Sequence, residues 1–117
     1  MNQSLSTALA KAMAYDKQRP ALLVAGVQAL NRLVPVALNF TSEGRAVGRF
    51  LLGLYNGEDF PFDLTELRGL DLALFEDCLA VLMMDYSPEV EVHERLEHGS
   101  AIWQRLMEMW APEVVDA

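Results

Sequence analysis

Apolar residues in the first third of the chain recur at the spacing of an α-helix. They fall at i, i+4, i+7 and i+8 in the first segment and at i, i+4, i+7 and i+11 in the second. These residues are Leu5, Leu9, Ala12 and Met13, followed by Leu23, Val27, Leu30 and Val34. Arg19–Pro20 predicts a break between two helices, because proline favours the first turn of a new helix. Pro35 predicts the end of the second helix or a kink in it.

A third helix is predicted to start at Thr41 or Ser42, since either residue suits an N-cap. Its apolar stripe, at i, i+3, i+4 and i+7, consists of Val47, Phe50, Leu51 and Leu54. Asn56–Gly57 is a strong stop signal. Three glycines lie in or beside this stripe: Gly44, Gly48 and Gly53. Each costs about 1 kcal/mol relative to alanine in a helix, so we expect another backbone to lie close by.

The segment after this helix carries signals for two more helical stretches. Asp63 and Glu66 have the spacing of a capping box and predict a short helical turn over residues 64–68. A longer helix is expected over residues 71–85. Its apolar set is Leu72, Phe75, Leu79 and Leu82, with Leu74, Cys78 and Val81 alongside. So broad an apolar band predicts a central helix that is covered on most of its surface.

The C-terminal part is less uniform. Ser87–Pro88 ends the preceding helix, and residues 87–99 then alternate charged and apolar side chains. This pattern suits an extended edge segment or a short helix, and the sequence does not decide between them. A last helix is expected over residues 100–110, where apolar side chains cover more than half of the circumference.

These elements predict an all-α fold: a single-domain bundle of about five helices with short loops, spanning residues 1–117. The helix over residues 1–19 is expected to be peripheral. The 117 residues are 52% hydrophobic and 22% charged, which is the composition of one globular domain. The longest uncharged run of interest, residues 20–31, is shorter than the ~18–20 apolar residues of a membrane span. Cys78 is the single cysteine, so no internal disulfide forms, and we expect a cytoplasmic protein.

Charge is distributed unevenly along the chain. Residues 1–56 hold six Lys/Arg and two Asp/Glu, a net +4, whereas residues 57–117 hold three and fifteen, a net −12. We expect the basic half to pack against the acidic half and to neutralise part of this asymmetry. The overall charge of −8 argues against direct nucleic acid binding, because no dense basic patch is present to displace counterions.

The chain contains, in order, the blocks ALNRLVPVA at 29–37, TSEGRAVGRFLLGLYNG at 41–57, FDLTELRGLD at 62–71, the pair Glu76–Asp77 and MWAPE at 109–113. Together these blocks resemble an uncharacterised bacterial domain family associated with plasmids and integrative conjugative elements. The resemblance implies a helical fold and a mobile-element origin, and it transfers no catalytic residue. Family members carry tryptophan near Leu54–Tyr55 and at Arg68, so a surface shaped by those aromatics is altered here.

No catalytic, cofactor or metal site is expected from the motifs. His93 and His98 bracket two glutamates, but they are five residues apart, about 140° around a helix, whereas a zinc-protease helix needs a spacing of four. Cys78 follows two carboxylates and lies among apolar residues, which favours a buried structural thiol over a nucleophile. We therefore expect no cofactor.

Candidate partner-binding residues are of three kinds. Arg45 and Arg49 share one helix face, and we weigh a contact site for a carboxylate or phosphate against plain structural ion pairing. The acidic candidates are Glu76, Asp77, Asp85, Glu89, Glu91 and Glu94. Trp103 and Trp110 suit either the core or an interface, including a homodimer formed by the terminal helix.

Three functions are consistent with these observations. The first is a non-enzymatic protein-binding accessory module of a bacterial mobile element. The second is an acidic inhibitor of a host defence complex, which would occupy the nucleic-acid-binding surface of a basic or nucleic-acid-handling protein. The third is a small enzyme or ligand-binding domain with a pocket between its helices. Membrane association is not expected.

Overall fold

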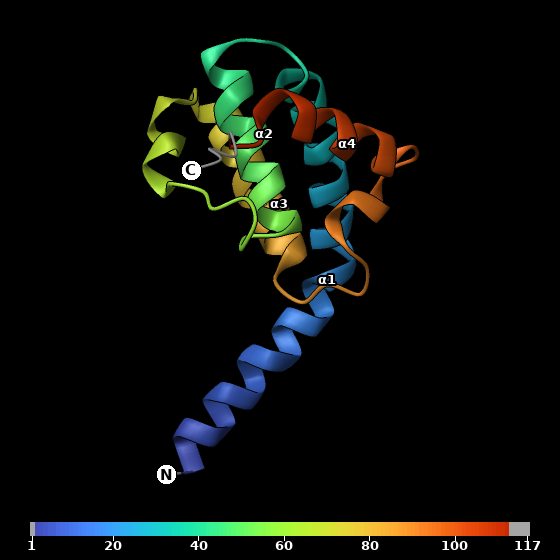
Figure 1. Ribbon diagram of the computed structural model, residues 1–117. Helices are drawn as coiled ribbons and strands as arrows, with labels where there is room; N and C mark the ends of the chain where they lie inside the picture. Colours follow the sequence, from blue (N-terminus) through green and yellow to red (C-terminus); the bar gives the residue numbers. More distant parts are fainter. Residues whose placement is uncertain (1, 113–117) are drawn as a thin grey trace.

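The longest element of the protein is its first helix, which passes through both internal prolines without a break (Figure 1). In the computed structural model residues 2–112 are described, and within them the chain forms four α-helices, two 3₁₀ helices and no strand. The elements are α1 (Asn2–Ala37), α2 (Ser42–Tyr55), η1 (Leu64–Gly69), α3 (Leu72–Asp85), η2 (Val92–Arg95) and α4 (Gly99–Trp110). The predicted all-α, single-domain fold is confirmed. Met1 and residues 113–117, including the end of the block at 109–113, lie outside the described part.

The predicted break at Arg19–Pro20 is wrong. Tertiary contacts hold the helix in the turns just before Pro20: the Arg19 guanidinium binds the Ser87 carbonyl at 3.2 Å, and the ring of Tyr15 packs edge-on against Tyr86 at 5.5 Å. The proline removes one helical hydrogen bond at an exposed position, where water reaches the free carbonyl. The helix then continues two residues beyond Pro35.

Because α1 is continuous, its length and composition would allow it to span a membrane. The mean hydropathy of its most apolar stretch is 1.3. The charged residues Lys11, Asp16 and Lys17 confine this apolar stretch to residues 18–37. That is the half of α1 that contributes Ala29, Leu30 and Leu33 to the core. Core packing accounts for part of the apolar stretch, of which 33% is buried.

The two halves of α1 have different surroundings. The second half packs against α2 and α3, whereas the side chains of residues 4–14 are all exposed. Figure 1 shows this first half extending away from the other helices. The longest dimension of the molecule, 56 Å against 33 and 27 Å for the other two, reflects this extension. We call residues 4–14 the arm.

The core is formed where α1, α2, α3 and α4 meet. Its fully buried large side chains are Leu30, Leu33, Val47, Leu51, Leu52, Cys78, Val81, Val92, Trp103 and Leu106. The face that α3 buries is that of Cys78, Val81 and Met84. The prediction that α3 is covered on most of its surface is wrong, because Leu72 and Leu79 lie on its opposite, exposed face.

Each of the last four carbonyl groups of α1 accepts a hydrogen bond. These carbonyls belong to Val34, Pro35, Val36 and Ala37. Backbone N–H groups of Leu38 and Asn39 and the side-chain amide of Asn39 bind the first three at 3.0–3.1 Å. The indole Nε1 of Trp110 donates to the last, at 2.7 Å. A helix end that is buried needs such partners, so α4 completes α1.

The start of α2 agrees with the sequence. Thr41 is its N-cap, and the hydroxyl of Thr41 accepts a hydrogen bond from the N–H of Gly44 at 2.9 Å. A methyl group at Gly44 would overlap the backbone carbonyls of Val36 and Asn39, so the expected close backbone is present. A methyl group at Gly48 would overlap the indole of Trp110. These two glycines let the end of α1 and the end of α4 pack directly on α2.

Candidate functional site

Two arginines of α2 converge on one glutamate of η1. Arg45 and Arg49 are one turn apart, and their guanidinium nitrogens lie 3.4 and 3.7 Å from the same Glu66 carboxylate oxygen. The side chain of Glu66 is 21% exposed, against 55% for Arg45 and 39% for Arg49. Both contacts are long for charge-assisted hydrogen bonds, which fall near 2.7–2.9 Å. The ion pairs that Glu66 forms with the two arginines are therefore weak.

The position of Glu66 follows from how η1 begins. Asp63 is its N-cap, and the Asp63 carboxylate accepts hydrogen bonds from the hydroxyl of Thr65 at 2.7 Å and from its backbone N–H at 2.9 Å. These bonds hold the pKa of Asp63 below its ordinary value. The side chain of Glu66 takes no part in this cap, so the predicted capping box is wrong, although the predicted turn is present as η1. Its carboxylate lies against α2 instead.

A pocket of about 460 Å³ opens beside this trio, between α2, the loop before η1 and the end of α4. Arg45, Arg49, Asp63 and Glu66 supply its charged groups, and its apolar wall consists of Leu52, Phe60, Pro61, Trp110 and Pro112. The two positive and two negative side chains cancel formally. An incoming carboxylate or phosphate that displaces Glu66 meets two guanidinium groups whose remaining N–H donors are directed at planar anions.

The sequence indicated Arg45 and Arg49 from their spacing, and the structure brings them together at one site. It missed Glu66, which the capping-box spacing assigned to another role, and it missed the wall. Phe60 and Pro61 come from a loop, and Trp110 comes from a helix 61 positions after Arg49. The pair Phe60–Phe62 flanking Pro61 was the available signal of an apolar loop.

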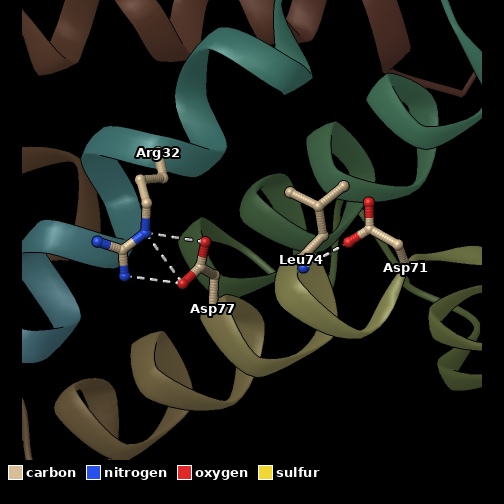
Figure 2. A network of polar contacts seen from close by, with 4 residues as sticks. All are labelled: Arg32, Asp71, Leu74 and Asp77. Carbon is tan, nitrogen blue, oxygen red and sulfur yellow. Dashed lines mark hydrogen bonds and ion pairs between the residues drawn. The ribbon is translucent and has the colours of Figure 1, made fainter.

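Asp77, a candidate for partner contact, forms an ion pair within the molecule. Figure 2 shows the guanidinium of Arg32, on α1, facing the Asp77 carboxylate, on α3, with N–O distances of 2.8–3.2 Å to both oxygens. These hydrogen bonds raise the pKa of Arg32 further above its usual value. Six residues earlier Asp71 caps α3, and its carboxylate accepts a hydrogen bond from the N–H of Leu74 at 2.8 Å. Asp77 therefore joins α1 to α3.

The remaining acidic candidates are dispersed. Glu89 pairs with Arg19 at 2.8 Å, and Glu94 accepts from the backbone N–H of Glu91 at the start of η2. Asp85 is half-buried, and its pKa is raised by loss of hydration and by the neighbouring charge of Glu91. Glu76 is exposed. These side chains do not form one patch with Arg45 and Arg49.

Ion pairs do join the two halves of the chain, as expected from their opposite charges. Four of the six basic residues of 1–56 pair with acids of 57–117: Arg19, Arg32, Arg45 and Arg49. The acidic half is the larger of the two in formal charge, so negative charge remains in excess after this pairing. The predicted mutual neutralisation is confirmed.

Trp103 and Trp110 belong to the core. Trp103 is 1% exposed, and its indole Nε1 donates to the carbonyl of Leu51 at 3.3 Å. Trp110 is 9% exposed, donates to Ala37 and contributes one edge to the pocket. The core interpretation of these tryptophans is confirmed, and they offer no exposed aromatic surface for pairing of two α4 helices.

The undecided segment 87–99 forms the short helix η2, with Val92 buried beneath it. His93 packs edge-on against Tyr55 at 5.1 Å and near Trp103, while His98 is exposed. Within residues 2–112 no group of three or more metal-ligating side chains lies together. Cys78 is buried, and burial raises its pKa to about 12, so the thiolate is scarce at neutral pH.

The chain matches a family model. No curated protein and no solved structure matches the chain. The match is to the model of a family of unknown function, DUF7673, over residues 27–111. This range covers every pocket residue except Pro112 and all of the core helices apart from the first part of α1, and it excludes the arm. The chain therefore belongs to the family of unknown function DUF7673.

Proposed function

We propose that this protein is a non-enzymatic protein-binding module whose pocket beside Arg45 and Arg49 receives an acidic segment of a partner. The observation that carries the proposal is the convergence of two guanidinium groups on one loosely held carboxylate, at a pocket that also has an apolar wall. Glu66 occupies the place that a carboxylate of the partner takes in the complex. The pocket volume of about 460 Å³ suits one or two side chains.

The chemistry of the pocket defines the bound segment. An Asp or Glu side chain replaces Glu66 and forms hydrogen bonds of about 1.5–3 kcal/mol each with the guanidinium groups, less where water screens them. An adjacent aromatic or aliphatic side chain packs on Phe60, Pro61 and Trp110. Affinity is therefore modest and falls with ionic strength.

Selection from a random peptide library, displayed on phage and panned against the wild-type protein, tests this proposal. We expect enrichment of peptides with an Asp or Glu beside an aromatic or aliphatic residue. Isothermal titration with the best synthetic peptide then compares variants. Arg45→Gln and Arg49→Gln each weaken binding about tenfold, the loss of ~1.4 kcal/mol.

Arg105→Gln provides the matched control, because Arg105 is an exposed arginine of α4 that pairs with Glu108 and lies outside the pocket lining. Its affinity for the peptide should equal that of the wild type. If no acidic peptide is enriched, or if all three variants bind equally well, the pocket is not the binding site.

The biological setting is a further part of the proposal. The resemblance to a plasmid-associated family supports a mobile-element accessory role in the bacterial cytoplasm, and the buried, unpaired Cys78 agrees with a reducing compartment. Gene neighbourhood tests this assignment. Conjugation genes beside the gene and its family members support it, and a consistent housekeeping neighbourhood contradicts it.

An acidic inhibitor of a host defence complex is the second candidate. The excess of negative charge in residues 57–117 supports it, together with the exposure of Glu76 and Glu91, which form no ion pair among the described side chains. Pull-down from host lysate at low salt, repeated at high salt, separates the two candidates. Capture of a basic, nucleic-acid-handling partner at low salt and its loss at high salt favour the inhibitor. If the Arg45→Gln variant still captures this partner, the pocket is not used for binding.

A further inference from the structure

Two apolar helix faces of this protein have no covering partner within residues 2–112. The first is on the arm, where Leu5, Leu9 and Met13 follow one another at i, i+4 and i+8. These side chains are 72%, 62% and 62% exposed. An isolated helix of this length is marginally stable in water, and a helix with an apolar stripe usually gains its stability from packing. The arm is therefore a helix without its packing surface.

The second face is the outer side of α3. Residues Leu72, Phe75, Leu79, Leu82 and Tyr86 fall at i, i+3, i+7, i+10 and i+14, the a/d spacing by which one helix packs along another. Leu72 is 69% exposed and Tyr86 is 76% exposed. At its first end this face continues into an apolar groove beside η1, lined by Leu64, Leu67, Arg68, Leu70, Leu72 and Phe75. We call this surface the α3 face; exposed apolar surface of this extent is typical of interaction sites.

Charge decides which helix suits the α3 face. Asp77 of α3 is paired with Arg32, and α3 has no basic residue. This leaves Glu76 and Asp85 as the acids of the helix that form no ion pair among the described residues. Arg68 is the basic residue of the groove at the η1 end of the face. The arm and the turn that follows it carry Lys11 and Lys17, against one acid, Asp16. Pairing two copies of α3 brings acids together, and pairing two arms brings lysines together. Pairing the arm with the α3 face combines opposite charges with two apolar stripes.

The arm cannot cover the α3 face of its own chain. Tyr15 contacts Tyr86 at the last turn of α3, and from that point the arm extends away from the body (Figure 1). The dimensions of the two surfaces agree: at 1.5 Å per residue the arm spans about 15 Å, and the stretch from Leu72 to Tyr86 about 21 Å.

We propose that two copies of this chain form a symmetric dimer by exchanging arms, each arm lying on the α3 face of the other copy. A single arrangement with twofold symmetry covers both apolar faces of both copies. The assembly is therefore closed at two copies, because no uncovered face remains to bind a third. Leu5, Leu9 and Met13 of one copy pack among Leu72, Leu79 and Tyr86 of the other. Lys17, which flanks the apolar stripe one turn after Met13, lies near Glu76, whereas Lys11 is on the opposite side of the arm. This dimer is independent of the pocket beside Arg45 and Arg49.

Light scattering on the full chain, coupled to size-exclusion chromatography, tests the dimer. The wild type should elute with twice the chain mass of 13.1 kDa at micromolar concentration. Leu9→Gln, on the arm, and Leu79→Gln, on the α3 face, should each weaken the dimer at least tenfold. Both residues are exposed, so the fold is retained, and circular dichroism checks this. Val90→Gln is the control, because Val90 is exposed in the loop after α3 and lies on neither surface.

The pattern across variants distinguishes the occupants. Loss of the dimer with Leu79→Gln alone indicates pairing of two α3 helices, and loss with Leu9→Gln alone indicates pairing of two arms. A wild type that is monomeric at all concentrations leaves both faces to another partner. Each of these three results overturns the proposal. Glu76→Lys should weaken the dimer, and the added change Lys17→Glu should restore it in part. Arg45→Gln should leave the dimer unchanged whether or not the proposed function is correct.

Discussion

The hydrogen bond that completes α1 gives the sharpest stability prediction. The indole of Trp110 is the sole donor to the Ala37 carbonyl among the described residues, at 2.7 Å in a buried position. Replacing Trp110 by β-(3-benzothienyl)alanine keeps the shape of the ring and removes only the N–H. A buried acceptor that loses its partner costs about 1–3 kcal/mol. The short, buried bond leads us to expect about 2 kcal/mol.

Trp103 provides the matched control, because its indole also donates to a backbone carbonyl. That bond is longer, 3.3 Å, and its acceptor, Leu51, lies inside α2, where the carbonyl keeps its helical hydrogen bond. The same replacement at Trp103 therefore leaves no acceptor without a partner. We expect it to cost less than about 1 kcal/mol.

Urea unfolding followed by far-ultraviolet circular dichroism measures both losses. The dependence of the unfolding free energy on urea should be unchanged, so that the midpoint alone reports the effect. Equal losses at the two positions, or a loss below about 0.5 kcal/mol at Trp110, would refute the view that α4 caps α1 through this bond.

Three further substitutions test other parts of the structure. The Nδ1 atom of His93 is buried without a partner among the described residues, so His93→Phe should raise the free energy of unfolding by about 1 kcal/mol; a loss in a thermal melt contradicts this. Gly99→Ala should cost about 2 kcal/mol in urea, because its methyl group would overlap the His93 carbonyl; a neutral result is evidence against that packing. Asp85→Asn should raise the melting temperature at pH 7 and leave it unchanged at pH 3. The pKa of Asp85 is raised because folding disfavours its charged form, so the stability of the wild type falls as pH rises through that pKa. A larger gain in melting temperature at pH 3 than at pH 7 contradicts the burial of that carboxylate.

The sequence predicted the helices better than their ends. The N-cap Thr41 and the stop at Asn56–Gly57 depend on local chemistry, and both are found where they were expected. The continuity of α1 through Pro20 depends on distant groups, since Ser87 and Tyr86 hold the helix there. No local pattern reports such contacts.

The buried face of α3 could not be chosen from the sequence. Apolar side chains surround most of this helix, so a face with Leu72 and Leu79 and a face with Cys78 and Val81 fit the same pattern. The choice is made by the packing of α1, which covers Cys78 and Val81 and leaves the other face exposed.

The sequence predicted the arginine pair of the candidate site but not the pocket beside it. The spacing of Arg45 and Arg49 placed two guanidinium groups on one face of a helix, which local geometry determines. The pocket itself depends on the docking of η1 and of the end of α4 on α2. Gly48, which permits the approach of Trp110, was recognised only as a sign of close packing.

The binding of an acidic peptide at the pocket can be observed directly by nuclear magnetic resonance. The protein has two tryptophans, and each gives one indole N–H signal in a ¹H–¹⁵N spectrum. Trp110 borders the pocket and Trp103 does not. On titration with the selected acidic peptide, we expect the Trp110 indole signal and the Nε–H signals of Arg45 and Arg49 to shift, while the Trp103 signal stays in place. Unmoved Trp110 and arginine signals at saturating peptide would contradict the proposed function.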